Sequence, residues 1–173
     1  MQKINFSATI NASKEKVWEI LWNLDAYRAW TSAFCEGSYA QTDNWKEGSK
    51  VLFLGPGESG MVSMVAVNKP YEYMSFKHLG EVKNGVVDTT SERVQVWAGS
   101  TENYNIKEEN GTTTVAVDLD ISEEYKEMFE KMWPKALEKV KALAEGTAKT
   151  KITSEAEVNA PIEKVWTTWT LPE

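Results

Sequence analysis

Residues 122–145, SEEYKEMFEKMWPKALEKVKALAE, carry the pattern that decides the fold. Ser122 is a residue type that caps helix starts, and Gly146 is the type that commonly ends helices. Between them the apolar side chains recur at steps of three and one, which matches the 3.6-residue period of a helix. They are Tyr125, Met128, Phe129, Met132, Trp133, Ala136, Leu137, Val140, Leu143 and Ala144. Such a wide stripe predicts a long helix that packs on a broad apolar surface.

Pro134 lies in the middle of this predicted helix. Proline removes one backbone hydrogen bond and costs about 3 kcal/mol in a helix interior. Two structures are therefore open: a break into two short helices, or one continuous, kinked helix. The apolar stripe keeps its phase across Pro134, so we favour the continuous helix, whose kink would let it follow a curved sheet.

The start of the chain predicts a strand followed by two short helices. Residues 3–11 alternate apolar and polar side chains, which is typical of a half-buried strand. Asn11 then stands where a helix cap is expected. A helix is predicted over residues 13–24, and Asp25 opens a second one that runs to Trp30.

The middle of the chain reads as β-structure. Asn110–Gly111 is a strong two-residue hairpin signal, and beyond it Asp118 and Asp120 are expected to face solvent. Gly80–Thr90 predicts a long loop, and Glu92–Trp97 a further strand. The other predicted strands are 37–42, 50–54, 60–67, 71–79, 102–108 and 112–121. Strands followed by a long helix predict an α+β fold, with an antiparallel sheet of about six to seven strands covered by that helix.

An internal repeat marks the two ends of the chain. Ile4–Trp18 reads INFSATINASKEKVW and Ile152–Trp166 reads ITSEAEVNAPIEKVW, with eight of fifteen positions identical. A repeat at one domain length predicts a tandem duplication. We therefore expect one domain over 1–146, and over 147–173 a linker plus the truncated start of a second repeat. That start cannot bury its own apolar face, so a homodimer formed through residues 150–173 is one expectation; docking on its own domain is the other.

Several motifs in this order resemble the START-like, or SRPBCC, superfamily, in the branch named for the activator of heat-shock protein 90 ATPase. They are NASKEKVWEIL followed by Tyr27 and Trp30, Gly60–Met61–Val62, Pro70–Tyr71–Glu72–Tyr73–Met74–Ser75–Phe76, Glu102–Asn103–Tyr104, and Trp133–Pro134 with Leu137 and Leu143. The resemblance spans about 1–146. It implies a helix-grip fold, in which a curved sheet wraps around the last helix and leaves a cavity between them.

Composition excludes several classes of function. The net charge of −7 and the pI near 4.9 argue against nucleic-acid binding and against an anionic membrane surface. The single cysteine, Cys35, forms no internal disulfide, which favours a cytoplasmic setting. The sequence shows neither a set of metal ligands nor a cofactor motif, so we expect neither a metal nor a cofactor.

The candidate site is the predicted cavity between sheet and helix. We expect it to be lined by Trp30, Phe34, Met61, Phe76, His78, Tyr104, Phe129, Met132, Trp133 and Leu137. The alternative is that these side chains simply fill the core. Apolar walls with a few polar groups are the usual lining of a small-molecule pocket. His78 is the one histidine, and it is a candidate polar anchor for a ligand or a candidate acid or base in catalysis; the alternative is a purely structural histidine. We predict binding of a small hydrophobic or amphipathic molecule without assigned catalysis. The alternatives are a cyclase-like or hydrolase-like enzyme, and a co-chaperone-like interaction module.

Overall fold

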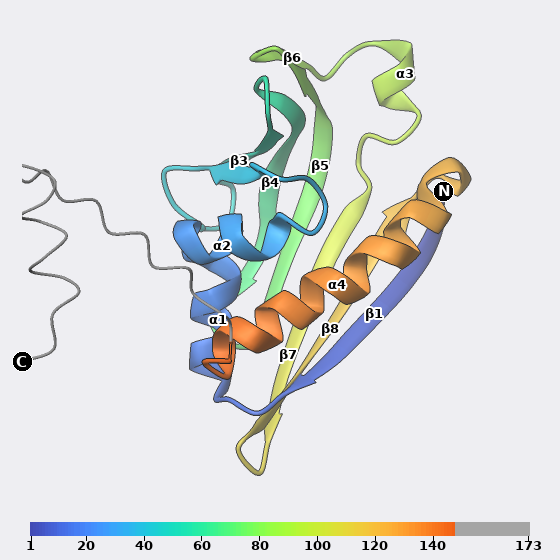
Figure 1. Cartoon of the computed structure of the whole chain (residues 1–173). Helices are drawn as coiled ribbons and strands as arrows, with labels where there is room; N and C mark the ends of the chain where they lie inside the picture. The colour runs from blue at the N-terminus through green and yellow to red at the C-terminus, as the bar shows by residue number, and fades with distance from the viewer. Residues whose placement is uncertain (148–173) are drawn as a thin grey trace, which may run out of the picture.

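The computed structural model describes residues 1–147, and Figure 1 shows a curved sheet that wraps around one long helix. The predicted second repeat and the predicted dimer segment, residues 150–173, lie outside the described residues. The helices are α1 (Lys14–Trp22), α2 (Leu24–Thr31), α3 (Glu92–Gln95) and α4 (Lys126–Ala144). The strands are β1 (Gln2–Ile10), β2 (Tyr39–Gln41), β3 (Lys50–Gly55), β4 (Ser59–Lys69), β5 (Tyr73–Lys83), β6 (Val86–Asp88), β7 (Thr101–Glu109) and β8 (Thr112–Ile121).

The strands form one antiparallel sheet in the order β1-β8-β7-β5-β4-β3-β2, and β6 pairs with β5. β1 pairs with β8 along its whole length, from Gln2 opposite Ile121 to Ile10 opposite Thr113. The first strand of the chain therefore pairs with the last one. The α+β helix-grip fold predicted from the sequence is confirmed, with α1 and α2 inserted after the first strand (Figure 1).

Helix α4 is continuous across Pro134, so the predicted single helix is confirmed and the break is not. Pro134 is exposed, and the buried face of the helix consists of Trp133, Ala136, Leu137 and Val140. Gly146 ends the helix in the left-handed conformation, with φ of 70°. No helix within residues 1–147 combines the length and the apolar character needed to cross a membrane.

Two predicted helix caps are wrong. Ser13, rather than Asn11, caps α1, because its hydroxyl accepts from the Lys16 N–H group. The Asn11 N–H group instead donates to Glu145, which ties the end of β1 to the end of α4. Ser122 makes no cap bond either, because a 3-10 turn, Glu123–Tyr125, precedes α4.

Two predicted segments between residues 80 and 97 are also corrected. The predicted loop Gly80–Thr90 contains the end of β5, a turn at Asn84–Gly85 and strand β6. Both turn residues have positive φ, 50° and 77°, as in the hairpin turn at Asn110–Gly111. The predicted strand Glu92–Trp97 contains the short helix α3, of which Val94 is the one buried residue. A single inward side chain gives no basis for the alternation of a strand.

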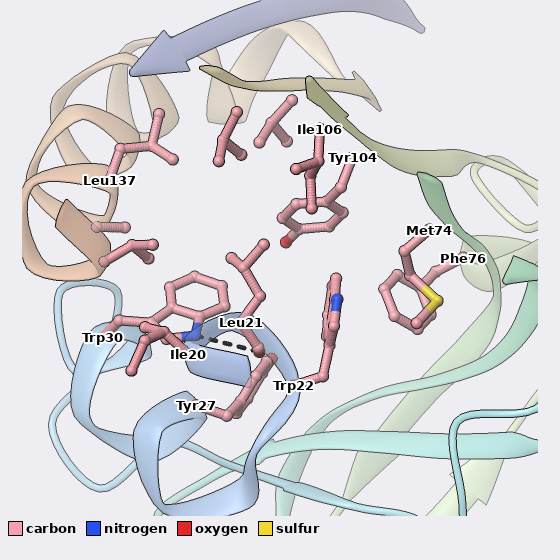
Figure 2. Close-up of a cluster of buried hydrophobic side chains, with 14 of the residues drawn as sticks. Ile20, Leu21, Trp22, Tyr27, Trp30, Met74, Phe76, Tyr104, Ile106 and Leu137 are labelled. Carbon is pink, nitrogen blue, oxygen red and sulfur yellow. Dashed lines mark hydrogen bonds between the residues drawn. The ribbon is translucent and has the colours of Figure 1, made fainter. Parts of the chain in front are cut away.

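The core fills the space between the sheet, α1, α2 and α4. Figure 2 shows Trp22, Tyr27 and Trp30 from the two short helices facing Tyr104 and Phe76 from the sheet. The rings interlock: the Trp22 ring centroid is 4.9 Å from that of Tyr104 and 5.3 Å from that of Phe76. The Trp30 indole also donates to the Leu21 carbonyl oxygen over 3.4 Å. The Trp22 and Tyr104 rings meet edge-on, a contact that contributes about 0.5–1.5 kcal/mol beyond the area the rings bury.

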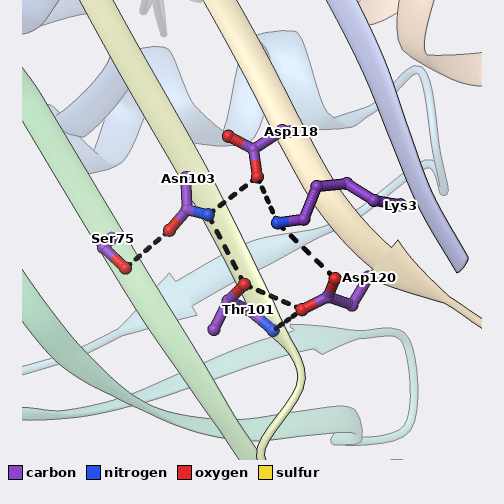
Figure 3. Close-up of polar contacts among 6 residues, drawn as sticks. All are labelled: Lys3, Ser75, Thr101, Asn103, Asp118 and Asp120. Atoms are coloured by element: carbon purple, nitrogen blue, oxygen red, sulfur yellow. Dashed lines mark hydrogen bonds and ion pairs between the residues drawn. The ribbon is translucent and has the colours of Figure 1, made fainter. Parts of the chain in front are cut away.

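The outer face of the sheet carries a polar network across β1, β8, β7 and β5 (Figure 3). The Lys3 ammonium lies 2.6 Å from an Asp118 oxygen and 3.5 Å from Asp120. Asp120 also accepts from the N–H and hydroxyl groups of Thr101, over 3.0 and 2.8 Å. Asn103 donates to Asp118 over 2.8 Å. Asp118 and Asp120 therefore face outward, as predicted, and they link neighbouring strands.

The Asp120 carboxylate makes the free energy of unfolding depend on acid pH. Burial opposes ionisation, but the bonds from Thr101 and the Lys3 charge outweigh it and lower the pKa of Asp120. A lowered folded pKa adds stability that is present above the unfolded value, about 3.9, and is lost as pH falls through the folded value. Replacing Asp120→Asn is expected to cost about 1 kcal/mol at neutral pH and to flatten the loss below pH ~4. Urea unfolding between acid and neutral pH measures both effects.

The matched control is Asp43→Asn, because Asp43 is exposed and belongs to none of the ion pairs recorded for residues 1–147. This change should leave the pH profile of the wild type in place. If the Asp120→Asn protein loses stability at acid pH as the wild type does, the network does not contribute to stability.

Candidate functional site

Four polar side chains meet on the inner face of β4, β5 and β7. The Ser63 hydroxyl oxygen and His78 Nδ1 lie 2.8 Å apart. On the other side of the ring, His78 Nε2 is 3.7 Å from Glu102 Oε2. The second oxygen, Glu102 Oε1, accepts from the Tyr104 hydroxyl over 2.5 Å. We call Ser63, His78, Glu102 and Tyr104 the polar cluster.

Strand register brings these residues together. Ser63 lies opposite His78 in the β4–β5 pair, where a register shift between Val62 and Ser63 interrupts the regular pairing. Glu102 lies opposite Phe76 in the β5–β7 pair. Alternation then puts Glu102 and Tyr104 on the same face of β7. Ser63 and His78, 15 positions apart in sequence, and His78 and Glu102, 24 positions apart, thus become neighbours because three strands are adjacent.

The polar cluster is almost entirely enclosed. Ser63 is 0% exposed, His78 5% and Tyr104 1%, while the Glu102 side chain keeps 15% of its surface exposed. Burial, and next the nearby Glu102 charge, raise the pKa of Tyr104 well above its ordinary value. The same two causes raise the pKa of Tyr27. Tyr104 therefore stays a hydrogen-bond donor to Glu102 at all physiological pH values, and Glu102 is the member of the cluster that solvent reaches.

Half of the ten residues predicted to line a cavity are packed in the core. These five are at most 3% exposed: Trp30, Phe76, Tyr104, Trp133 and Leu137. Trp133 shows how closely they pack, because its ring centroid lies 5.0 Å from Phe34 and 6.1 Å from Tyr104. Their inward direction agrees with the prediction, and rings of their neighbours occupy the space beside them.

His78 is buried within the polar cluster, and the remaining four predicted residues are half-buried. Phe34 and Phe129 contact each other, with ring centroids 6.3 Å apart, and both pack on the edge of the core. Met132 is on α4, between Phe129 and the buried part of the helix. Met61 pairs with Phe53 and Glu81 and belongs to neither of the two buried apolar clusters of residues 1–147.

Two of the depressions on the described part of the protein are large, and neither is lined by any of the ten predicted residues. One, of about 930 Å³, lies near the start of α1 and is lined by Lys14, Glu15, Lys69, Glu72, Tyr73, Asn105, Ile106, Lys107, Glu108 and Glu109. The other, of about 620 Å³, lies on β1, β7 and β8 and is lined by Asn5, Phe6, Ser7, Asn105, Lys107, Thr114, Ala116, Val117 and Asp118.

Ser63 and Glu102 are missing from the predicted site, although a sequence signal existed for both. Ser63 has the same strand parity as Met61, and Glu102 the same parity as Tyr104, and both of these partners were predicted to face inward. A small serine and a charged carboxylate gave no apolar signal, so the alternation alone pointed to them. Trp22 was also missed. The predicted helix continued to residue 24, whereas α1 ends at Trp22 and the Asn23 side chain caps α2.

The chemistry open to the polar cluster is hydrogen bonding and charge pairing. Ser63 is fully buried, so no substrate atom reaches its hydroxyl in this arrangement. Within residues 1–147, no group of three or more His, Cys, Asp or Glu side chains is arranged to hold a metal ion. Two buried indole N–H groups, those of Trp22 and Trp133, have no acceptor among the described residues.

Comparison with solved structures places this architecture among known ones. An Aha1 from Colwellia psychrerythraea, described as a dimer, aligns with a TM-score of 0.62 and 18% identity over 85% of this chain and 98% of its own. An AHSA1-like protein from Aeromonas hydrophila aligns with a TM-score of 0.60 and 17% identity, over 88% of this chain and 100% of its own. A protein from Mesorhizobium loti reaches 0.63 with 14% identity, over 85% and 99%.

No protein-family model matches the chain, and no curated protein matches it significantly. At identities of 14 to 18%, the likeness to solved structures concerns the fold. The shared features are the ones described above: a curved antiparallel sheet, two helices after the first strand and a long final helix in its grip. The described part of this chain therefore shares the helix-grip fold of these solved structures.

Proposed function

We propose that this protein binds a small amphipathic molecule between the inner face of the sheet and the first half of α4. The observation that carries the proposal is the position of Glu102, a partly exposed carboxylate set among buried aromatic rings. A charged group in such surroundings is costly unless it is paired or serves a ligand. Apolar walls with a few polar groups are the usual makeup of small-molecule sites.

A continuous series of contacts joins this polar end to an apolar edge. Glu102 accepts a hydrogen bond from the Tyr104 hydroxyl. The centroid of the Trp133 ring lies 6.1 Å from that of Tyr104 and 5.0 Å from that of Phe34. Phe34 in turn contacts Phe129, and both rings are half-buried. An amphipathic molecule would place its polar end at Glu102 and its apolar part against Phe34 and Phe129. The half-buried rings would have to move apart by side-chain rotation to admit it.

The enzyme alternative has weaker support. A hydrolase built on Ser63 and His78 would need an accessible hydroxyl, and Ser63 is 0% exposed. The carboxylate also stands 3.7 Å from the imidazole, beyond hydrogen-bond length. These contacts suit a fixed polar wall better than a catalytic triad. Only the fold supports the alternative of a co-chaperone-like interaction module.

Titration of the full chain with 1-decanol, followed by ¹H–¹⁵N NMR, tests this proposal. We expect saturable shifts at Glu102, Tyr104, Phe34 and Phe129, because these residues connect the two ends of the site. Replacing Phe129→Ser should weaken decanol binding by about tenfold. Burying a phenyl group contributes about 1.5 to 3 kcal/mol of favourable free energy.

The control is Val96→Ser, because Val96 is 74% exposed and lies in the segment after α3. This variant should bind decanol as the wild type does. The absence of saturable shifts, or shifts centred on Val96, would rule out the proposed site.

A further inference from the structure

We infer that the polar end of the bound molecule is a protonated amine. This inference rests on the proposed function and adds the chemical class of its ligand. It follows from the sign of the charge that meets the ligand at the polar cluster, and from the rings around that charge.

The inner wall offers a negative charge with little to neutralise it. Glu102 has one oxygen bonded to the Tyr104 hydroxyl, and its other oxygen lies 3.7 Å from His78 Nε2. Within residues 1–147, no lysine or arginine side chain is buried, and the recorded lysine and arginine ion pairs involve other carboxylates. A ligand carboxylate or phosphate placed beside Glu102 would therefore meet a like charge without a cation to balance both. A protonated amine would pair with Glu102.

Aromatic rings near Glu102 add to the same preference. Tyr104 bonds directly to Glu102, and its ring has Trp22 at 4.9 Å, Trp133 at 6.1 Å and Phe76 at 6.3 Å. The faces of aromatic rings attract cations, and the attraction grows when the site is shielded from water. These rings are at most 5% exposed and pack on one another, so an ammonium group would contact the Glu102 carboxylate and have the rings beside it.

One feature of the same wall favours the opposite class. The buried indole N–H groups of Trp22 and Trp133 lack acceptors among the described residues, and a ligand carboxylate could accept from both. The Glu102 charge decides against this, because like charges in a shielded site repel more strongly than a neutral donor attracts. The two features predict opposite orders of affinity, so one experiment separates them.

The experiment compares three probes with the same ten-carbon chain: decylamine, 1-decanol and decanoate. Binding to the full-length protein is measured by calorimetry below the concentration at which the probes form micelles. We expect decylamine to bind about tenfold more tightly than decanol, and decanoate more weakly than decanol. Decanoate binding as tightly as decylamine, or more tightly, would overturn the inference and leave the proposed function in place. If none of the three binds, the proposed function itself fails.

Two variants at the same position test whether Glu102 causes the preference. Glu102→Gln should reduce the affinity for decylamine about tenfold and change the affinity for decanol by less than about twofold. Glu102→Asp keeps the charge and should keep the order of the three probes. Glu109→Gln is the matched control for net charge, because Glu109 is exposed at the β7–β8 hairpin. A decylamine preference that survives in Glu102→Gln, or is lost equally in Glu109→Gln, would show that the general negative charge of the protein causes it.

Discussion

Replacing Trp133→Ala is expected to lower the free energy of unfolding by about 3–5 kcal/mol. Trp133 is 2% exposed and belongs to the main hydrophobic core. Its ring stacks on Phe6 from β1 at 5.8 Å and contacts Phe34 at 5.0 Å and Tyr104 at 6.1 Å. Alanine would leave a large cavity between the helix and the sheet, because these rings lie on β1, on β7 and in the turn after α2 and cannot all move inward. Urea unfolding monitored by circular dichroism measures the loss.

Met128 provides the matched control on the same helix. Its side chain is 39% exposed, so Met128→Ala is expected to change stability by less than about 1 kcal/mol. Equal losses in the two variants would mean that α4 does not pack on the sheet through Trp133.

The second large effect is expected at Gly80, where two parts of the backbone cross closely. A Cβ atom at this position would overlap the carbonyl oxygen of Asp88 and lie 3.0 Å from Thr89 Cα. Asp88 is the last residue of β6 and Thr89 follows it, and these main-chain atoms cannot rotate away as a side chain does. Gly80→Ala should therefore destabilise the protein by about 1–3 kcal/mol and disturb the β5–β6 hairpin. Unfolding midpoints and hydrogen exchange of the β6 amides measure the two effects.

Gly55 is the control for the loss of glycine from a strand. A Cβ atom there would lie 3.6 Å from the Cys35 sulfur and 3.7 Å from the Ser59 carbonyl oxygen, both ordinary contact distances. Gly55→Ala should leave stability unchanged or raise it by about 0.4–1 kcal/mol, because alanine restricts the unfolded chain. A Gly80→Ala protein as stable as Gly55→Ala would contradict the close crossing.

The errors of the sequence analysis fall where local and tertiary signals compete. Asn84–Gly85 is the same turn dipeptide type as Asn110–Gly111, but the few large apolar residues around it predicted a loop. The structure pairs β6 with β5 there, because a backbone ladder forms between adjacent strands even when side chains such as Val86 and Val87 stay exposed. The outward direction of Asp118 and Asp120, by contrast, followed from alternation alone and is confirmed.

The fold of this protein could be predicted from patterns within its amino-acid sequence. Periodic apolar residues define α4 and β8 within single segments, and each pattern depends only on neighbours a few positions apart. The tertiary structure alone decided how the interior is filled, and that Ser63, His78, Glu102 and Tyr104 meet. Their contacts depend on which strands lie side by side and on a shift in register between β4 and β5. Packing and long-range register are properties of the assembled sheet, so no single stretch of sequence encodes them.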